Sequence, residues 1–351
     1  MRVLAAMSGG VDSSVAAALA LEGGHEVVGV TLKQWEDDRG VMTGCCTVAD
    51  AEDARRVAAV LDIPYYVLDY RTEFRTEVVE RFVAGYAAGR TPNPCIECNR
   101  RVRFSALLER AHALGCDALA TGHHARVIRR DGAWRLRTAA DTAKDQSYVL
   151  HMLGQDVLGS VMFPVGEMTK DEVRDHARRL GLRTASKPDS QDLCFVGPSG
   201  TRDFLRRRGV SGGPGPILDR DGTVVGAHDG AAGFTIGQRR GLGVALGEPR
   251  YVTEVRPADG VVRIGLRSDL DALGCDVDDM SFVAGPPEGD GALGVKVRSR
   301  GAPVPARAAP AGSGWRIDFE GPAGAVAVGQ AAVLYRGDEV VGGGPITRVA
   351  V

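Results

Sequence analysis

The sequence lacks the features that mark several common protein classes. It has no charged-then-apolar leader and no apolar run long enough to span a membrane, so we expect a soluble, cytoplasmic protein with no membrane partner. It shows no internal repeat or low-complexity tract, which excludes a repeat architecture. Neither sign of charge dominates, because 43 Lys and Arg residues face 45 Asp and Glu residues. A nucleic-acid surface must therefore be a local basic patch.

Two common nucleotide-binding loops are absent as well. The Gly-rich run near the N-terminus has no lysine after its glycines, as the loop G-x-x-x-x-G-K-[ST] requires, and it does not read G-x-G-x-x-G. Its residues are Ser8-Gly9-Gly10-Val11-Asp12-Ser13-Ser14. Glycines allow positive φ and a close backbone approach, serine hydroxyls donate, and a helix N-terminus attracts anions, so the run predicts a phosphate site. Asp12 indicates either a magnesium ion or a polar hold on the turn.

The same run resembles the S-G-G-x-D-S pyrophosphate loop of enzymes that split ATP into AMP and pyrophosphate. An ordinary strand-to-helix turn with a Ser or Asp cap is the alternative interpretation. The strand pattern before the run and the helix pattern after it favour the phosphate site. Enzymes with such a loop adenylate an acceptor, so we expect an ATP-using enzyme.

The first half of the chain has the pattern of an α/β domain. Strand and helix patterns alternate, with strands over 2–7, 26–32, 65–69 and 117–121 and helices over 13–22, 49–61, 72–88 and 103–114. A further helix over 169–180 begins with a Thr169-x-x-Glu172 capping box. The alternation predicts a doubly wound parallel sheet that binds its ligand at the carboxyl ends of the strands.

The pattern changes after about residue 208. A cluster of Gly and Pro over 212–216 interrupts it, and short β-rich runs follow over 251–256, 261–265, 293–299, 315–319, 331–335 and 346–351. We expect three domains. They are an ATP-binding catalytic domain over 1–208, a small β-rich central domain over 209–272 and a C-terminal β-barrel over 273–351.

Seven cysteines in a chain without a signal peptide indicate thiols that are free, metal-binding or catalytic, because a disulfide framework belongs to oxidising compartments. Cys95 and Cys98 stand three apart, before Arg100, Arg101 and Arg103 and before a helix that we expect to start near Ser105. Nearby cations and a helix N-terminus lower thiol pKa values and favour nucleophiles. Two partly buried cysteines in a rigid loop are the alternative, because a single C-x-x-C is weak as a zinc motif.

The other cysteines are less informative when each is considered alone. Cys194 follows a polar loop, so it is interpreted either as a small core residue or as an exposed thiol. Cys45 and Cys46 read as incidental loop thiols, and Cys116 and Cys275 read as packing residues beside strands. It is the combination of Cys98 and Cys194 with an ATP loop that indicates sulfur chemistry.

Together these segments are similar to those of the tRNA-specific 2-thiouridylases, which place sulfur on C2 of the wobble uridine. The matching motifs run in the family's order over the first 242 residues, and a weaker match continues to the end. They are Ser8 to Ser14, Lys33-Gln34-Trp35, Thr91-Pro92-Asn93-Pro94, Cys98-Asn99, Thr121-Gly122-His123, Lys144-Asp145-Gln146-Ser147-Tyr148, Lys187-Pro188-Asp189-Ser190-Gln191, Cys194-Phe195 and Gly237-Gln238-Arg239-Arg240-Gly241-Leu242. The resemblance implies a PP-loop domain of the adenine nucleotide alpha hydrolase type.

The resemblance also implies an ATP-dependent sulfur transfer. ATP, together with a magnesium ion, would bind at the residues Ala6, Met7, Ser8, Gly9, Gly10, Val11, Asp12, Ser13, Leu32 and Gly122. It would adenylate the uridine C2 oxygen and release pyrophosphate. Cys194 would carry a persulfide supplied by a sulfur-relay protein or a cysteine desulfurase, and Cys98 would be its partner nucleophile. A transient Cys98–Cys194 disulfide would remain for reductants to open.

The tRNA contacts that the resemblance implies are spread over the chain. Asn93, Pro94 and Cys95 would meet the extruded target base, and the remaining contacts would be His123, Lys144, Asp145, Gln146, Arg298, Ser299 and Gln330. Arg-rich runs such as Arg206-Arg207-Arg208 support an RNA partner. The alternatives are a solvated turn at 144–146 and a buried carbonyl satisfied by His123 or Gln330.

One position departs from the family pattern. Some members carry an aspartate near the target base where this chain has Cys95, so either Glu97 or solvent covers its role, or the role is minor. A second hypothesis is that Cys95, Cys98 and Cys194 hold an iron–sulfur cluster with one open iron.

Several other enzymes keep the pyrophosphate loop and change the acceptor. Argininosuccinate synthetase, the GMP synthetase amination domain and tRNA-lysidine synthetase have no need of Cys98 and Cys194. The 4-thiouridine enzyme would carry RNA-binding modules ahead of the loop, which here starts at residue 8. A catalytically silent tRNA-binding protein would not need Asp12 and both cysteines.

Overall fold

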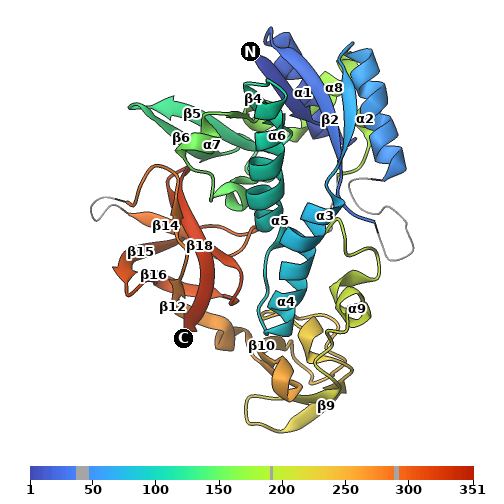
Figure 1. Ribbon diagram of the computed structural model, residues 1–351. Helices are drawn as coiled ribbons and strands as arrows, with labels where there is room; N and C mark the ends of the chain where they lie inside the picture. Colours follow the sequence, from blue (N-terminus) through green and yellow to red (C-terminus); the bar gives the residue numbers. More distant parts are fainter. Residues whose placement is uncertain (37–46, 190–192, 288–291) are drawn as a thin grey trace.

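The computed structural model describes residues 1–36, 47–189, 193–287 and 292–351. The described strands form sheets of five, four and nine strands, in three different parts of the molecule (Figure 1). The first sheet is parallel and has the strand order β3-β2-β1-β4-β7. Its strands are β1 (Arg2–Ala6), β2 (Glu26–Lys33), β3 (Tyr65–Asp69), β4 (Ala118–Thr121) and β7 (Val161–Met162).

Helices cover both faces of this sheet, as the alternating pattern predicted. Val3 and Ala5 of β1 pack on one face, and Leu4 packs into a second core on the other face. The helices on the side of Val3 are α1 (Val11–Glu22), α2 (Val48–Val60) and α8 (Lys170–Arg179). The predicted capping box of α8 is confirmed, since Thr169 and Glu172 bond each other's backbone N–H groups.

The order of the strands reverses between β1 and β4. The chain adds β2 and β3 on one side of β1, and it adds β4 and β7 on the other side. The loops that follow β1 and β4 therefore flank a crevice at the carboxyl ends of the strands, where doubly wound sheets bind ligands. The predicted phosphate run, which follows β1, lies at this reversal.

A long helical hairpin packs on the side of Leu4. Its first arm is α3 (Arg71–Phe74), a π-helical part (Arg75–Glu80) and α4 (Arg81–Ala87), and its second arm is α5 (Pro94–Glu97), a π-helical part (Cys98–Leu107) and α6 (Leu108–Ala113). The predicted helix start near Ser105 is wrong. Asn93 caps the helix by accepting the backbone N–H of Cys95 at 3.1 Å, and Pro94 fits the first helical position.

The central part of the chain forms a small antiparallel and parallel sheet. Its strands, in the order β10-β11-β8-β9, are β8 (Gly215–Leu218), β9 (Val224–His228), β10 (Tyr251–Arg256) and β11 (Val261–Gly265). Helix α9 (Gly200–Arg207) leads into it. Ile217, Val252 and Ile264 form its own core. The predicted small β-rich unit is confirmed.

The C-terminal part is a closed antiparallel barrel. Its strands are β12 (Asp271–Val277), β14 (Leu293–Lys296), β15 (Val304–Ala311), β16 (Gly314–Gly324), β17 (Ala331–Arg336) and β18 (Glu339–Ala350), with the short β13 (Ser281–Phe282) beside β18. Strand β12 pairs with both β16 and β18, which closes the ring. The predicted barrel is confirmed, whereas the residue boundaries 208 and 272 stay predictions.

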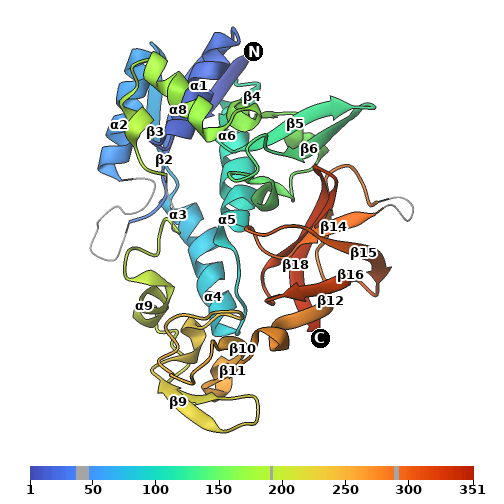
Figure 2. The same cartoon turned by 180° about the vertical axis from the view of Figure 1, so that it is seen from behind.

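One hairpin in the first half was not predicted. Strands β5 (Ala125–Arg130) and β6 (Ala133–Thr138) leave the first domain and join the barrel sheet, where Arg137 pairs with Glu339 of β18 (Figure 2). Arg126 and Arg137 also contact Asp338. The hairpin therefore fixes the barrel against the first domain. In the ranges described above, no helix is long and apolar enough to cross a membrane.

Candidate active site

The predicted phosphate loop connects the end of β1 to the start of α1. Gly9 has φ +71°, and a Cβ there would lie 2.3 Å from the backbone oxygen of Asp50, so only glycine fits. Gly10 does not use the positive φ that the sequence suggested. It is extended, with φ −92° and ψ 163°, and it is the residue that precedes the first turn of α1.

Serine hydroxyls bind the loop to itself. The hydroxyls of Ser13 and Ser14 donate to the carbonyl of Gly10 at 3.1 and 2.8 Å, and the backbone N–H of Ser8 donates to Ser13 Oγ at 3.0 Å. These bonds shape the turn ahead of the helix N-terminus. A turn of this shape, with the positive end of a helix dipole behind it, suits a phosphate group.

The parallel register brings the other predicted ATP residues to the same sheet edge. Ala6 pairs with Val30 of β2 and with Thr121 of β4, so Leu32 and Gly122 lie at the ends of the two strands that flank β1. A Cβ on Gly122 would lie 2.5 Å from the backbone nitrogen of Ser13. The loop and the end of β4 therefore touch through backbone, and glycine is required for that contact. Met7 and Leu32 are buried beside them.

Asp12 is held by two side chains from other parts of the chain. Its carboxylate lies 3.1 Å from His124 Nε2 and 2.8 Å from the ammonium of Lys170. Burial by itself would raise the pKa of Asp12, but hydrogen bonds from His124 and Lys170 outweigh it and keep this pKa below its ordinary value. Asp12 thus stabilises the turn through polar contacts with His124 and Lys170, which is one of the two roles considered for it.

Lys170 is a residue that sequence reasoning missed. It is 8% exposed, and its ammonium also lies 2.8 Å from Asp189. Asp189 in turn accepts from Lys144 at 2.7 Å and from Arg174 at 2.8 Å. Burial would raise the pKa of Asp189, but hydrogen bonds from Lys144 and Lys170 lower it to about 2. A chain of ion pairs thus joins the phosphate loop to the segment before Cys194.

The amino-acid composition could have indicated that Lys170 has a special role. Only five of the 43 basic residues are lysines, and each of the five forms an ion pair in the structure. In such an arginine-rich chain a lysine stands out as a site that needs a compact ammonium rather than a planar guanidinium.

Lys187 fastens the same segment to the loop from another side. Its ammonium donates to the carbonyl of Gly9 at 2.9 Å, to Asp50 at 2.6 Å and to Asp53 at 2.8 Å. The segment that leads to Cys194 is therefore attached to the phosphate loop through both Lys187 and Asp189. Residues Ser190 and Gln191 of this motif, and the cysteines at 45 and 46, lie outside the described residues.

The three cysteines of interest have different surroundings. Cys95 is exposed in the first turn of α5, Cys98 is buried beside the Gln34 amide at 3.7 Å, and Cys194 is partly buried against the same apolar core as Cys98. Within the described ranges, no three His, Cys, Asp or Glu side chains are grouped so that they could hold a metal ion. The hypothesis of an iron–sulfur cluster on these cysteines is not supported, because the helix turns Cys95 to the surface and Cys98 into the core.

The predicted target-base residues lie beside the junction of the three domains. The loop before Asn93 contacts the barrel, where the backbone N–H of Thr91 donates to Val328 and the Gln330 amide donates to the carbonyl of Thr91 at 2.7 Å. In the same loop Gly89 packs against Pro257 of the central domain. Gln330 thus satisfies a backbone carbonyl in this structure, which is the alternative considered for it.

The turn at 144–146 is built into the fold rather than solvated. Asp145, whose side chain is 4% exposed, contacts Lys296 of β14 at 3.1 Å and accepts from Ser147. Gln146 exchanges two hydrogen bonds with the backbone of His124. The solvated-turn alternative is therefore wrong, and the turn connects the barrel to the residue that holds Asp12.

The remaining predicted RNA contacts differ in exposure. His123 is 6% exposed, and burial lowers its pKa to about 3, so it is neutral at pH 7. Its ring nitrogens lie 2.7 Å from Thr121 Oγ1 and 3.4 Å from Arg103. Arg298 and Ser299, by contrast, are exposed after β14. Arg298 and Ser299 are therefore accessible without a change of conformation, and His123 is not.

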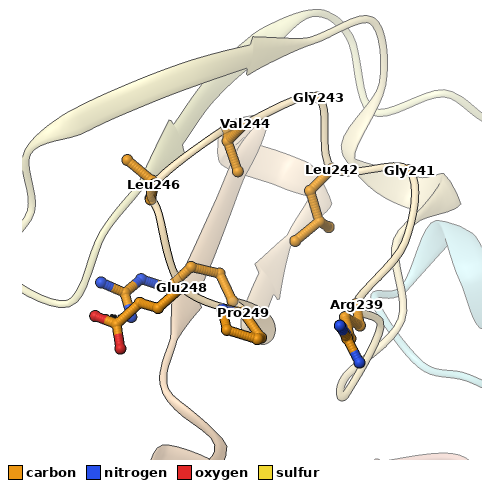
Figure 3. A pocket seen from close by; sticks show the side chains of 9 residues that line it. Arg239, Gly241, Leu242, Gly243, Val244, Leu246, Glu248 and Pro249 are labelled. Atoms are coloured by element: carbon orange, nitrogen blue, oxygen red, sulfur yellow. Dashed lines mark ion pairs between the residues drawn. The ribbon is translucent and has the colours of Figure 1, made fainter.

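A hollow of about 220 Å³ lies in the central domain, at the end of the molecule away from the phosphate loop (Figures 1 and 3). Residues that line it are Arg239, Leu242, Val244, Leu246, Glu248 and Arg250. Glu248 and Arg250 form an ion pair at 2.9 Å. This hollow contains none of the predicted ATP or cysteine residues.

Sequence profiles of three domain families match successive parts of the chain. The profile described as tRNA methyl transferase HUP domain covers residues 1–198, tRNA methyl transferase PRC-barrel domain covers 202–266, and aminomethyltransferase beta-barrel domain covers 272–346.

Full-length relatives were found as well. The chain is 48% identical over 355 residues to the tRNA-specific 2-thiouridylase MnmA of Chloroflexus aurantiacus, with 99% of each chain covered. It is 47% identical over 363 residues to the tRNA-specific 2-thiouridylase MnmA of Streptomyces avermitilis, with 100% of this chain and 96% of the relative covered. A solved 4-thiouridine synthetase–RNA complex with bound ATP matches 59% of this chain and 50% of its own, at 17% identity and a TM-score of 0.37.

Proposed function

The chain belongs to the family of tRNA-specific 2-thiouridylases, and on this basis we propose that it catalyses the ATP-dependent 2-thiolation of the wobble uridine in the tRNAs for Lys, Glu and Gln. The products are 2-thiouridine, AMP and pyrophosphate. The contact of Lys187 with the carbonyl of Gly9, at 2.9 Å, is the observation that carries the proposal. It attaches the segment of a candidate sulfur carrier to the loop suited to the phosphates of ATP.

The first step is adenylation of the uridine. ATP lies on the loop from Ala6 to Ser13, and Leu32 and Gly122 line its adenine and ribose side. The C2 oxygen of the uridine attacks the α-phosphorus, and the bond to the β-phosphate breaks with release of pyrophosphate. A carbonyl oxygen, which is a poor leaving group, thus becomes the oxygen of AMP.

The second step transfers sulfur. The outer sulfur of a Cys194 persulfide loses its proton to solvent and attacks C2, and the C2–O bond breaks as AMP leaves with its electron pair. The Cys98 thiolate then attacks the inner sulfur, which is that of Cys194. The S–S bond to the uridine breaks, the uridine keeps the outer sulfur, and a Cys98–Cys194 disulfide forms. An external thiol reductant supplies the two electrons that reopen it.

The RNA-binding surface includes the junction of the three domains. Asn93, Pro94 and Cys95 meet the flipped base. The exposed Arg298 and Ser299 contact the RNA backbone, and the partly exposed Lys144 adds a cation beside Asp189. His123, Asp145, Gln146 and Gln330 become RNA contacts only if their present hydrogen bonds are replaced by bonds to RNA. Arginines that follow Cys98 on the same helix add positive charge near the base.

A magnesium ion would be held by Asp12 together with phosphate oxygens. The Asp12 carboxylate is 30% exposed and faces the loop, which fits this role, but it already receives the ammonium of Lys170. Mg²⁺ would supply charge neutralisation of the phosphates. Lys170 and His124 hold the carboxylate when it carries no ion.

The experiment is thiolation of unmodified tRNA by the purified chain, with ATP and a persulfide donor protein, followed by mass spectrometry of the nucleosides. We expect 2-thiouridine at the wobble position, and tRNA from a deletion strain should lack it. Formation of 4-thiouridine, or of no thiolated nucleoside while the deletion strain keeps 2-thiouridine, would overturn the proposal.

A further inference from the structure

A buried amide group lies beside the sulfur of Cys98. Gln34 Nε2 is 3.7 Å from Cys98 Sγ, within reach of an N–H···S hydrogen bond. Gln34 is 2% exposed and Cys98 is 7% exposed. A hydrogen bond to a charged acceptor is stronger than one to a neutral acceptor, and low exposure to water strengthens it further. This contact therefore stabilises a thiolate more than a thiol.

The backbone around Gln34 is fixed on both sides. Gln34 directly follows β2, where the carbonyl of Lys33 accepts the backbone N–H of Tyr70 at 2.9 Å. The next residue, Trp35, is 4% exposed and packs against Phe74, with ring centroids 6.4 Å apart. Because the backbone is fixed on both sides of Gln34, its amide occupies a defined position and can orient the Cys98 side chain.

Trp35 also reaches the segment of the second cysteine. Its ring makes an edge contact with Phe195, with centroids 6.2 Å apart, and Phe195 directly follows Cys194. Two consecutive residues, Gln34 and Trp35, therefore contact Cys98 and the immediate neighbour of Cys194.

We propose that Gln34 is a positioning residue for sulfur transfer, whose amide donates to Cys98 Sγ and favours the thiolate that attacks Cys194. Trp35 anchors the amide and, through Phe195, the segment of the sulfur carrier. The proton of the Cys98 thiol goes to solvent. The Gln34–Cys98 contact is independent of the proposed function, whereas the role of Cys98 in sulfur transfer rests on it.

Several charged groups on the surrounding elements form ion pairs with one another. On the helix of Cys98, Glu97 pairs with Arg101, and Arg101 also contacts Glu77 of the first hairpin arm. Beside Gln34, Glu36 pairs with Arg71 and Lys33. The other titratable or charged groups around the site include His151, whose pKa burial lowers to about 4, and the thiols of Cys95 and Cys194. Arg100 and Arg103 lie on the helix of Cys98, and Arg208 lies over the Trp35 ring at 5.2 Å. Substitution of Gln34 leaves the ion pairs in place, so a change in Cys98 ionisation reports the amide.

The test is the pH profile of Cys98 alkylation by iodoacetamide, measured by peptide mass spectrometry. A Cys95→Ser background is used because both cysteines fall in one tryptic peptide. Gln34→Met removes the donor with little change of volume, and Gln34→Glu places a carboxylate there. We expect the midpoint to rise by roughly one pH unit in Gln34→Met, which is about tenfold less thiolate below the midpoint, and further in Gln34→Glu.

The matched control is Tyr65→Phe. It removes a hydroxyl that donates to Thr31 Oγ1 in the neighbouring strand β2 and lies 3.0 Å from the carbonyl of Ala51 in α2, and it should leave the midpoint unchanged. An unchanged midpoint in a folded Gln34→Met or Gln34→Glu protein would overturn the proposal. Alkylation needs neither tRNA nor ATP, so this result is independent of whether the chain thiolates tRNA. In single-turnover thiolation, the Gln34→Met rate should fall about tenfold at pH 7 and recover at higher pH, whereas a structural defect would not recover.

Discussion

Lys170 contacts both carboxylate oxygens of Asp12 at 2.8 Å, although the two residues stand 158 positions apart in the sequence. The same ammonium lies 2.8 Å from Asp189. One buried cation thus connects the phosphate loop with the segment that leads to Cys194. Removal of either carboxylate leaves charge poorly compensated, which makes this connection sensitive to pH and to substitution.

Asp189→Asn should destabilise the protein in a pH-dependent way. The pKa of Asp189 is lowered to about 2 from an ordinary value of 3.8, so the ionised form stabilises the fold above the pH at which the unfolded carboxyl titrates. The stabilisation is lost as pH falls from about 4 towards 2. We expect a loss of about 2 kcal/mol at pH 7 that shrinks below pH 4, measured by urea unfolding.

Asp175→Asn is the control for this prediction. Asp175 pairs with Arg178 on the exposed side of α8, with both side chains about 60% exposed. Such surface pairs contribute little, so the free energy of unfolding should change little at any pH. A loss in Asp189→Asn that stays constant from pH 7 to pH 3 would contradict the assigned ionisation.

Gly122→Ala should weaken ATP binding. The added Cβ would lie 2.5 Å from the backbone nitrogen of Ser13, so the loop must shift away from the end of β4. Overpacking of this kind costs about 1–3 kcal/mol, which corresponds to a loss of roughly 5- to 150-fold in affinity if the loop holds the phosphates. Titration calorimetry with a non-hydrolysable ATP analogue measures the effect.

The control for Gly122→Ala is Gly321→Ala in β16, where an added Cβ meets no atom within 4 Å. That variant should bind the analogue as the unaltered chain does. If Gly122→Ala, folded by circular dichroism, also binds with full affinity, the loop after β1 is not the phosphate site.

The features predicted correctly are those encoded by neighbouring residues. The strand, the Gly-rich loop and the helix at the N-terminus occupy one continuous stretch, and the capping box at Thr169 and Glu172 spans four residues. The barrel was predicted from its alternating short strands. Each of these signals is complete within a short window of sequence.

The features that were missed depend on distant partners. No residue next to Lys170 in the sequence indicates that it contacts Asp12. Likewise, the sequence of β5 and β6 does not show that Arg137 pairs with Glu339 of the barrel. The start of the helix before Cys98 was missed for a different reason. A proline disfavours the interior of a helix, but Pro94 after the Asn93 cap is a favourable helix start.

Cys98→Ser and Cys194→Ser should each abolish thiolation and leave ATP binding largely intact. A serine hydroxyl neither carries a persulfide nor attacks a disulfide, whereas the phosphate loop does not include either residue. The measurement is nucleoside mass spectrometry together with binding of the ATP analogue. Cys116→Ala, at a buried cysteine beside β4, is the control that should retain thiolation. Wild-type rates in either serine variant would show that the assigned roles are wrong.

Tyr148→Phe should loosen the contact between the first domain and the barrel. The Tyr148 hydroxyl is fully buried, donates to the carbonyl of Ala331 at 2.8 Å and accepts the backbone N–H of Ala331 at 3.2 Å. Phenylalanine keeps the ring but leaves both backbone groups without this partner, at a cost of roughly 2 kcal/mol in the free energy of unfolding. Because Ala331 directly follows Gln330, which bonds the loop before Asn93, thiolation should slow as well. Tyr66→Phe, at a residue that is 58% exposed, is the control and should change neither the free energy of unfolding nor the thiolation rate. Equal effects of the two variants would show that the buried Tyr148 hydroxyl does not stabilise this interface.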